Sequence, residues 1–378
     1  NMKKRLFTPG PTPVPEHVML TMAEPIIHHR NPEFGEILKS TFENLQYLFQ
    51  TKQPVLALTS SGTGSMEASV ANFLSAGDTA IYVNGGKFGE RWGNILRAYG
   101  CKAIEIKVEW GTAVTVDEIL AKLKENPETK AVYITHSETS TGIATDVRAI
   151  TKAVHEKSNA VVIVDGITAV GCMELRFDEW DMDCVVTGSQ KGLMIPPGLS
   201  FIALSERVIK MMETSNLPKF YFNLKKELAS WQKTDTSWTP AVSLFIGVNE
   251  SLKMIKAEGI ENVWKRHEKL SRACREGCKA IGLKLFGNSP SYAVTAVNVP
   301  EGVSFSDFNK ILKFKYGVTV AGGQDHLKGK IFRISHLGYY DDFDMVTMIS
   351  ALEMSLKEIG WKFDIGSGVA AAQKALCE

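Results

Sequence analysis

Short runs of apolar residues alternate along this chain with stretches of helical periodicity. Seven of the runs are candidates for β-strands, and most of them lack the alternation of apolar and polar residues that a half-exposed strand would show. Such runs are typical of strands covered by helices on both faces. They occupy residues 55–58, 79–83, 103–107, 131–135, 160–164, 184–187 and 201–204. The pattern predicts a doubly wound α/β fold with a mostly parallel, seven-stranded sheet, whose ligands gather at the carboxyl ends of the strands.

The pattern changes beyond about residue 245. Helical periodicity then covers residues 242–256 and 263–281, with an interruption near Gly259. Strand-like residues 293–299, 318–320 and 330–335 follow, interleaved with helices at 306–316 and 342–359. A chain of 378 residues exceeds what one hydrophobic core usually supports. We therefore expect an extended N-terminal segment (1–20), a large domain (21–248) and a smaller C-terminal α+β domain (249–378).

Composition excludes several kinds of partner. Lys and Arg (43) nearly balance Asp and Glu (42), so no nucleic acid and no membrane surface is expected to bind. No apolar run approaches the roughly 18 residues of a membrane span, and no apolar segment of a signal peptide follows Lys3-Lys4-Arg5. The six cysteines show no CxxC spacing, which indicates reduced thiols in a cytoplasmic protein.

Two strand ends predict an acid and an amine at one edge of the sheet. Asp165 directly follows the apolar run 160–164, and Lys191 follows the run 184–187 within Gly188-Ser189-Gln190-Lys191-Gly192. A helix cap or an ion pair is the alternative role for Asp165, and a surface loop position is the alternative for Lys191. However, a carboxylate at the end of an apolar strand is costly to bury unless a cation lies beside it.

A third segment predicts a phosphate site. The stretch Thr59-Ser60-Ser61-Gly62-Thr63-Gly64-Ser65 links the strand at 55–58 to a helical stretch that opens at Met66. The N-terminus of a helix binds anions through free N–H groups, although an ordinary turn with a Ser or Thr cap would have a similar sequence. Phosphate, carboxylate and lysine sites together are what pyridoxal 5′-phosphate requires of a protein.

These segments, and others in the same order, resemble the class V aminotransferases of the fold-type I enzymes that use pyridoxal phosphate. The chain is most similar in this respect to the alanine–glyoxylate and serine–pyruvate aminotransferases. The other segments that carry the resemblance are Thr8-Pro9-Gly10-Pro11-Thr12, Asn84-Gly85-Gly86-Lys87-Phe88-Gly89-Glu90-Arg91, Glu138-Thr139-Ser140-Thr141-Gly142, Pro196-Pro197-Gly198 and Gly329-Lys330-Ile331-Phe332-Arg333-Ile334-Ser335-His336. The resemblance runs through nearly the whole chain.

The resemblance implies a role for each matching residue. Lys191 would carry the cofactor as a Schiff base, and Asp165 would hold the protonated pyridine nitrogen. Phe88 lies where relatives stack an aromatic ring on the cofactor, Thr139 where a hydroxyl bonds the phenolic oxygen, and Gln190 where a side chain reaches the phosphate region. The implied cofactor-binding residues are Ser61, Gly62, Thr63, Phe88, Thr139, Asp165, Ile167, Gln190, Lys191, Thr236 and Thr239. Several relatives have histidine at the position of Thr63.

Arg333 is the candidate substrate-binding residue. It lies among apolar neighbours in the strand-like Ile331-Phe332-Arg333-Ile334. A guanidinium there can bind a carboxylate through two parallel hydrogen bonds, and a buried salt bridge is the alternative.

The segment around Thr236 and Thr239 resembles one that relatives insert into the neighbouring subunit, which implies a homodimer with shared active sites. No lysine or arginine is expected near Ser61, Gly62 and Thr63, so the phosphate would depend on N–H groups and on hydroxyls from the partner. Trp238 is expected to be exposed. For His28-His29-Arg30 the resemblance implies a place at the mouth of the substrate site as one alternative, and we favour a solvated or interface loop. We expect no metal site, because adjacent histidines do not share a helix face.

The favoured function is transfer of an amino group from a small amino acid, alanine or serine, to glyoxylate or another small 2-oxo acid. A single well-placed arginine favours a donor with one carboxylate. Alternatives are a donor such as aspartate or 2-aminoethylphosphonate, or a lyase or cysteine desulfurase, although Cys274 and Cys278 lie in a helical context that fits a catalytic loop poorly. A member that binds the cofactor without catalysis is a further alternative, against which the intact Lys191 argues.

Overall fold

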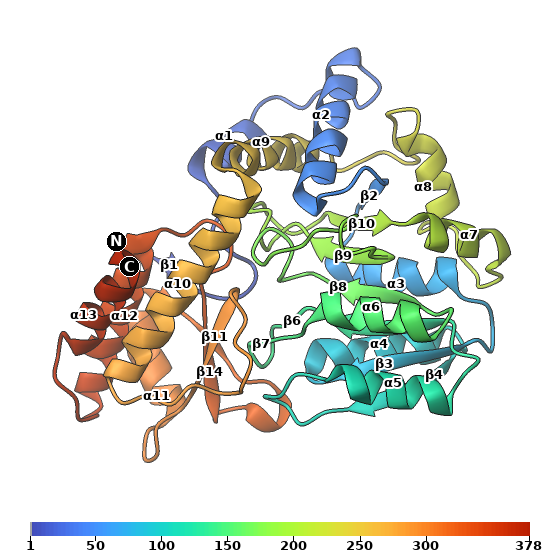
Figure 1. Cartoon of the computed structure of the whole chain (residues 1–378). Helices are drawn as coiled ribbons and strands as arrows, with labels where there is room; N and C mark the ends of the chain where they lie inside the picture. The colour runs from blue at the N-terminus through green and yellow to red at the C-terminus, as the bar shows by residue number, and fades with distance from the viewer. Residues whose placement is uncertain (1) are drawn as a thin grey trace.

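The computed structural model describes residues 2–378 and has a seven-stranded central sheet (Figure 1). Its strands are β2 (Val55–Leu58), β3 (Thr79–Asn84), β4 (Lys102–Lys107), β5 (Ala131–Thr135), β8 (Val161–Asp165), β9 (Cys184–Gly188) and β10 (Ser200–Leu204). They lie in the order β2-β10-β9-β8-β5-β3-β4. Only β10 runs antiparallel to its neighbours, since the β3–β4, β3–β5, β5–β8 and β8–β9 pairs are all parallel. The predicted mostly parallel sheet is confirmed.

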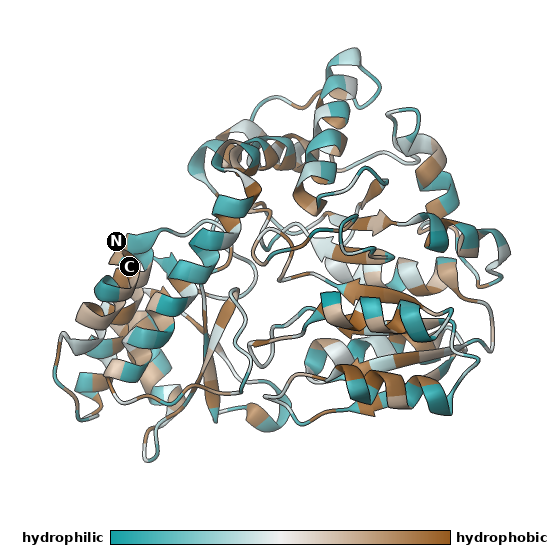
Figure 2. Cartoon of the chain, in the orientation of Figure 1, coloured by the Kyte–Doolittle hydropathy of each residue, from teal (hydrophilic) through white to brown (hydrophobic). Residues whose placement is uncertain are grey.

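Helices cover both faces of this sheet, which confirms the doubly wound arrangement. One apolar cluster joins the sheet to α2 (Pro32–Phe49), α5 (Val116–Glu125), α6 (Val147–Lys157) and α9 (Val242–Glu258). A second cluster joins the other face to α3 (Gly62–Phe73), α4 (Lys87–Ala98), α7 (Glu206–Thr214) and α8 (Leu224–Trp231). Strands β5, β8, β9 and β10 are buried along their whole length, which explains their unbroken apolar sequences (Figure 2).

A smaller C-terminal part packs around a third apolar cluster, drawn in orange to red in Figure 1. Its three-stranded antiparallel sheet has the order β11-β14-β13, from β11 (Val294–Asn298), β14 (Ile331–Ser335) and β13 (Ala321–Gly322). Its helices are α10 (Ile260–Ala280), α11 (Phe305–Lys310), α12 (Asp342–Glu358) and α13 (Ser367–Cys377), with a π-helical turn at Ile311–Lys315 and a 3₁₀ turn at Asp325–Leu327. The domain limits at residues 20 and 248 stay a prediction. The first apolar cluster itself extends as far as Trp264.

Gly259 separates α9 from α10, as its position in the sequence indicated. Its backbone has φ 87°, in the left-handed region that glycine adopts without steric cost. The predicted strand at 318–320 corresponds to β12 (Val318–Thr319). The next strand, β13, begins at Ala321 and belongs to a different sheet.

The N-terminal segment is held by the smaller part of the protein. Strand β1 (Arg5–Leu6) pairs in parallel with β12, and the backbone oxygen of Phe7 accepts a hydrogen bond of 2.9 Å from the N–H of Ser335 in β14. The segment then turns to the large sheet before α1 (Glu16–Met22), whose Val18 is buried in the first apolar cluster. Residues 5–18 therefore connect both parts of the fold.

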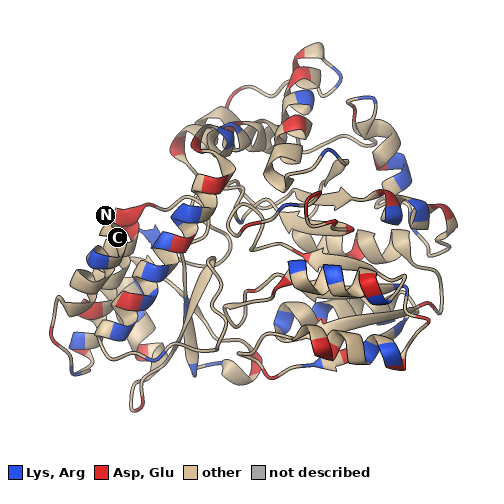
Figure 3. Ribbon diagram, viewed as in Figure 1, with Lys and Arg blue, Asp and Glu red and all other residues tan. Residues whose placement is uncertain are grey.

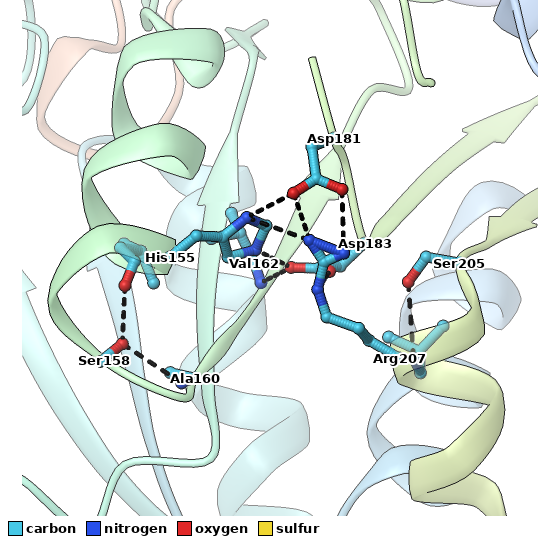
Figure 4. A network of polar contacts seen from close by, with 10 residues as sticks. His155, Ser158, Ala160, Val162, Asp181, Asp183, Ser205 and Arg207 are labelled. Atoms are coloured by element: carbon cyan, nitrogen blue, oxygen red, sulfur yellow. Dashed lines mark hydrogen bonds and ion pairs between the residues drawn. The ribbon is translucent and has the colours of Figure 1, made fainter. Parts of the chain in front are cut away.

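A polar network on one side of the sheet ties α6, β8 and α7 together (Figure 4). At its centre is Asp183, whose side chain is fully buried just before β9. One oxygen of Asp183 accepts hydrogen bonds of 2.7 Å from His155 Nε2 and from the N–H of Val162, and Arg207 Nε lies 3.2 Å from the other oxygen. The hydrogen bond to Asp183 is the main cause that raises the pKa of His155 above its ordinary value.

Basic and acidic residues are interspersed over the outer helices, while the central strands are almost free of them (Figure 3). Among the described residues, none of the helices is both long enough and apolar enough to cross a membrane.

Candidate active site

The carboxyl ends of β2, β8 and β9 surround a small hollow that opens to solvent. Nine of the predicted site residues line it, and the tenth lining residue is Arg91, which the sequence analysis did not predict. The lining residues are Ser61, Gly62, Thr63, Phe88, Arg91, Thr139, Asp165, Ile167, Gln190 and Lys191.

Lys191 lies in the turn that follows β9, with its amine turned toward the hollow. The pKa of the amine is lowered to about 8, mainly by burial; the charge of Asp165 opposes this shift, and the guanidinium groups of Arg333 and Arg91 contribute to it. The amine donates a hydrogen bond of 2.7 Å to the carbonyl oxygen of Pro9. A lysine with a lowered pKa is deprotonated often enough near neutral pH to act as a nucleophile.

Asp165 ends β8 and is buried, with 2% of its surface exposed. Its Oδ1 accepts a hydrogen bond of 2.9 Å from the N–H of Ile167. Burial raises the pKa of the carboxyl to about 7. The residues around this carboxylate do not fully stabilise its charge. A cation bound in the hollow would therefore stabilise its ionised form.

The loop before α3 leaves the N-terminus of that helix open to an anion. Ser61 is the N-cap residue, but its side chain makes no capping hydrogen bond. The first N–H groups of a helix have no partner within the helix, so they are available to a ligand. Gly62 packs closely here, because a Cβ atom at this position would lie 2.6 Å from Ile167 Cδ1.

Three serine hydroxyl groups fix this loop to the sheet. Ser200 Oγ in β10 lies 2.8 Å from Ser60 Oγ and 2.6 Å from Ser65 Oγ. Ser65 and Ser200 are fully buried. The sequence analysis missed Ser200, because its partners are far away in the chain and only the pairing of β10 with β2 brings them together.

Arg91 overturns one expectation about this loop. Its Nη1 donates a hydrogen bond of 2.9 Å to Thr63 Oγ1, and its guanidinium lies 4.9 Å from the centre of the Phe88 ring. The expectation that no lysine or arginine lies near Ser61, Gly62 and Thr63 was therefore wrong. Helix α4 brings this charge to the loop, although Arg91 was already part of a segment that carried the family resemblance.

Three further side chains bring an aromatic ring and hydrogen-bonding groups to the hollow. Phe88 is half-buried and lines it, and Gln190 has its side-chain oxygen buried without a hydrogen-bond partner among the described residues. Thr139 Oγ1 lies 3.0 Å from Thr168 Oγ1, which in turn donates to the carbonyl oxygen of Ser137. Thr139 is thus oriented by contacts on the side of β8.

Arg333, in β14, is buried beside the hollow. Its Nε donates to the carbonyl oxygen of Gly322 and its Nη1 to that of Thr139, each at 2.9 Å. Within the described part of the chain, no Asp or Glu oxygen lies within 4.0 Å of its guanidinium. The alternative of a buried salt bridge is therefore wrong. Burial lowers the pKa of Arg333 to about 10, which shows how much this group lacks a negative partner.

The remaining candidates lie elsewhere. Thr236 and Thr239 line a separate hollow with Tyr221 and Phe245. Trp238 was expected to be exposed but is half-buried, because it stacks on Tyr221 and lies under the amine of Lys226.

The loop at His28-His29-Arg30 does not line the hollow either. The two histidine rings stack on each other, and Arg30 forms an ion pair with Asp235. Between residues 2 and 378, no group of three or more His, Cys, Asp or Glu residues could hold a metal ion. Cys274 and Cys278 are fully buried on α10, and no cysteine lines the hollow.

The fold and this set of strand ends define a fold-type I enzyme of the kind that uses pyridoxal phosphate. Residues 6–367 match the family model described as aminotransferase class V. The chain belongs to this family and is a transaminase, as its motifs implied.

Several characterised proteins are similar over their full length. The chain is 37% identical to the L-aspartate–glyoxylate aminotransferase of Paracoccus denitrificans, over 98% of this chain and 95% of the relative. It is also 37% identical to the serine–glyoxylate aminotransferase of Hyphomicrobium methylovorum, over 97% and 93%. A Synechococcus protein described as the small subunit of a soluble hydrogenase is 44% identical, over 99% and 98%.

The crystal structure of ureidoglycine–glyoxylate aminotransferase from Bacillus subtilis superposes with a TM-score of 0.95 at 28% identity. The match covers 100% of this chain and 99% of that chain. The two proteins therefore share the whole fold.

Proposed function

We propose that this protein uses pyridoxal phosphate to transfer the amino group of a small amino acid, alanine or serine, to glyoxylate or another small 2-oxo acid. One observation carries the proposal: a lysine of lowered pKa, a buried carboxylate and an open helix N-terminus border the same hollow.

The residues of the hollow fit this cofactor. Asp165 would hold the protonated ring nitrogen, which supplies the cation that its buried carboxylate lacks. The N–H groups of α3, the hydroxyl groups of Ser61 and Thr63 and the charge of Arg91 would bind the phosphate. Phe88 would stack on one face of the ring.

When bound, the cofactor supplies a carbonyl that condenses with amines and a ring that accepts the electron pair left by the α-proton. Lys191 would hold the group through its amine, and its free amine could move a proton between the α-carbon of the substrate and the neighbouring carbon. Asp165 would keep a proton on the ring nitrogen.

Arg333 serves both halves of the reaction. An amino acid and a 2-oxo acid each carry a carboxylate beside the reacting carbon, so one guanidinium can orient either of them. Glyoxylate as the acceptor is supported by the names of the relatives from Paracoccus, Hyphomicrobium and Bacillus.

A panel of amino acids tests this proposal through the first half of the reaction. The purified enzyme with bound cofactor is mixed with each donor, and the change of its absorption spectrum to that of the amine form is followed. Alanine or serine should react fastest, and the product should then transfer its amino group to glyoxylate. If no donor converts the cofactor, the proposed function is wrong.

Arg91 supports aspartate as a second candidate donor. Within the described residues it has no Asp or Glu oxygen within 4.0 Å, so its guanidinium could bind a distal carboxylate in the same hollow as Lys191. The Paracoccus relative is named for aspartate. If aspartate is the donor, Arg91→Gln should raise its KM by about tenfold or more and leave the KM of serine almost unchanged. A rise in cofactor Kd with all donors would instead assign Arg91 to the phosphate.

We propose in addition that the enzyme is a homodimer with two shared sites. The charge of Arg91 weakens the earlier argument, since the phosphate does not depend on hydroxyl groups alone. Two observations remain as support. Thr236 and Thr239 do not line the hollow of their own chain. Large apolar side chains nearby are exposed, among them Phe220 with 79% of its surface. Thr236 also has a buried hydroxyl oxygen without a partner in the described chain.

The soluble hydrogenase description applies to the Synechococcus relative. The hollow of this chain presents an amine, a carboxylate, hydroxyl groups, an amide and a guanidinium, and no cysteine lines it. That description therefore does not support a hydrogenase activity for this chain.

A further inference from the structure

A buried carboxylate, Glu138, links two segments that border the hollow. Glu138 belongs to the short strand β6 (Ser137–Glu138) and is 5% exposed. Its Oε1 accepts a hydrogen bond of 3.1 Å from the N–H of Phe88, and its Oε2 accepts one of 2.9 Å from the N–H of Gly89. Ser140 Oγ donates a further hydrogen bond of 2.7 Å to Oε1.

These contacts make Glu138 the cap of helix α4. The N–H groups of Phe88 and Gly89 belong to the first turn, where a helix offers no acceptor of its own. The N-cap residue Gly86 has no side chain to provide one. A negative charge at this end also interacts favourably with the helix dipole.

Gly86 provides the space that this cap needs. A Cβ atom there would lie 2.3 Å from Glu138 Cδ and 2.5 Å from Ser140 Oγ. Its φ of 171° is extended and open to any residue, so the requirement for glycine is one of space and not of backbone conformation.

Two side chains that line the hollow lie in or just after this first turn of α4. Phe88 and Arg91 both project from α4 into the hollow. Since Glu138 holds the N–H of Phe88 itself, the position of the ring depends on this carboxylate.

The same segment also contacts Arg333, beside the hollow. The carbonyl oxygen of Thr139, the residue after Glu138, accepts the hydrogen bond from Arg333 Nη1. The charge of Glu138 also opposes the lowering of the pKa of Arg333 by burial. Glu138 is therefore tied to the stacking ring through its side chain and to the carboxylate-binding arginine through the backbone.

We propose that Glu138 is a positioning residue that fixes the ring of Phe88, which lines the hollow, relative to the guanidinium of Arg333, which lies beside it. This inference rests on the proposed function, because it assumes that Phe88 contacts the cofactor and that Arg333 binds the substrate carboxylate.

The test uses two variants that disturb this contact from opposite sides. Glu138→Gln keeps the shape but turns one acceptor into an NH₂ donor, which opposes an N–H group of α4. Gly86→Ala adds the Cβ that would displace Glu138, and it remains informative if Glu138→Gln does not fold.

Glu118→Gln is the matched control, because Glu118 completes the capping box of α5, and it does not line the hollow. Gly35→Ala, where a Cβ atom would meet nothing within 4 Å, is the control for the glycine variant.

Three quantities are measured. Hydrogen exchange at the first turn of α4 in the cofactor-free protein should become about tenfold faster in both variants. The Kd for pyridoxal phosphate and the KM for the amino donor should each rise about tenfold, while kcat at saturation changes less than about threefold. The two controls should leave all three quantities as in the wild type.

The outcomes are distinct. If both variants only lower the melting temperature and leave the exchange, the Kd and the KM unchanged, Glu138 is merely structural and the inference is wrong. If the wild-type protein itself does not bind pyridoxal phosphate, the proposed function fails and this inference fails with it.

Discussion

The amine of Lys191 donates a hydrogen bond of 2.7 Å to the carbonyl oxygen of Pro9, which lies 182 positions earlier in the chain. Thr12 adds hydrogen bonds from its hydroxyl to the carbonyl oxygens of Gln190 and Lys191. A Cβ atom on Gly10 would lie 2.0 Å from the amine. The N-terminal segment thus covers the lysine, and the resulting burial is the main cause of its lowered pKa.

Lys191 should be the only lysine that borohydride fixes to the cofactor. Its placement at the hollow and its lowered pKa favour a Schiff base there. Peptide mapping after reduction locates the label. Lys191→Ala should abolish the label and lower turnover by about 10³-fold or more, because it removes both the attachment and the base. Lys219 is the matched control, since burial lowers its pKa too but it lies outside the hollow. A label on Lys219 or on another lysine would contradict the assignment.

Asp165→Asn should stabilise the cofactor-free protein while it cripples turnover. The pKa of Asp165 is raised to about 7 in the folded protein, so its ionised form destabilises the fold. The difference between variant and wild type should be absent only below about pH 3, where the acid is protonated in both the folded and the unfolded state. It should grow toward pH 7 and stay constant above it. Melting temperatures across this range measure it, and we expect a gain of about 2 °C or more. Turnover should fall by at least about 100-fold. A variant with near-normal turnover would show that Asp165 does not support the ring nitrogen.

Arg333→Lys should raise the KM of both substrates by about 100-fold, because a point charge replaces the planar fork that matches a carboxylate. The Kd of the cofactor, measured alongside, should change little, since Arg333 does not line the hollow around Lys191. Equal losses in cofactor and substrate binding would indicate that the substitution disturbs the fold instead.

Mixed dimers test the shared sites. Subunits carrying Lys191→Ala are combined with subunits carrying Thr236→Val and Thr239→Val, and activity is measured after exchange of subunits. Shared sites should restore one intact site in each mixed dimer. Two separate single-chain sites would give no recovery.

His155 should make stability depend on pH. Its pKa is raised, mainly by the hydrogen bond to Asp183, so its contribution is fully present below about pH 6.5. The contribution is lost as the pH rises through the higher folded pKa. The difference in melting temperature between wild type and His155→Gln should therefore be largest at about pH 6 and should shrink at alkaline pH. A difference that does not vary with pH would mean that the charge of His155 contributes nothing.

The sequence predicted the central sheet well, because each strand is a short apolar run between polar loops and is buried on both faces. It did not predict β1 or β13, which have two residues each. Strand β1 pairs with β12 near the other end of the chain, and β13 is too short to give a sequence pattern of its own. Helix α13 was missed as well. Its Ala372 and Ala375 become buried only through the neighbouring α10 and α12.

The sequence predicted those site residues whose role can be read from a single motif. It did not predict contacts between residues of different motifs. The contribution of Arg91 to the loop at Thr63 could not be predicted from spacing, since it depends on how α4 lies beside α3. Glu138 was part of a motif, but its role depends on two N–H groups in another segment. Pairwise contacts of this kind arise from tertiary packing and leave no local signal in the sequence.

The pairing of β1 with β12 joins Arg5 to Val318. During synthesis, the first strand therefore leaves the ribosome long before its partner exists, and contacts between such distant segments form late in folding. Once it has been made, Lys191 should therefore stay accessible to solvent and to free aldehydes until β12, near the end of the chain, anchors the segment that covers it. We expect the covering of the lysine to be one of the later steps in the maturation of the protein.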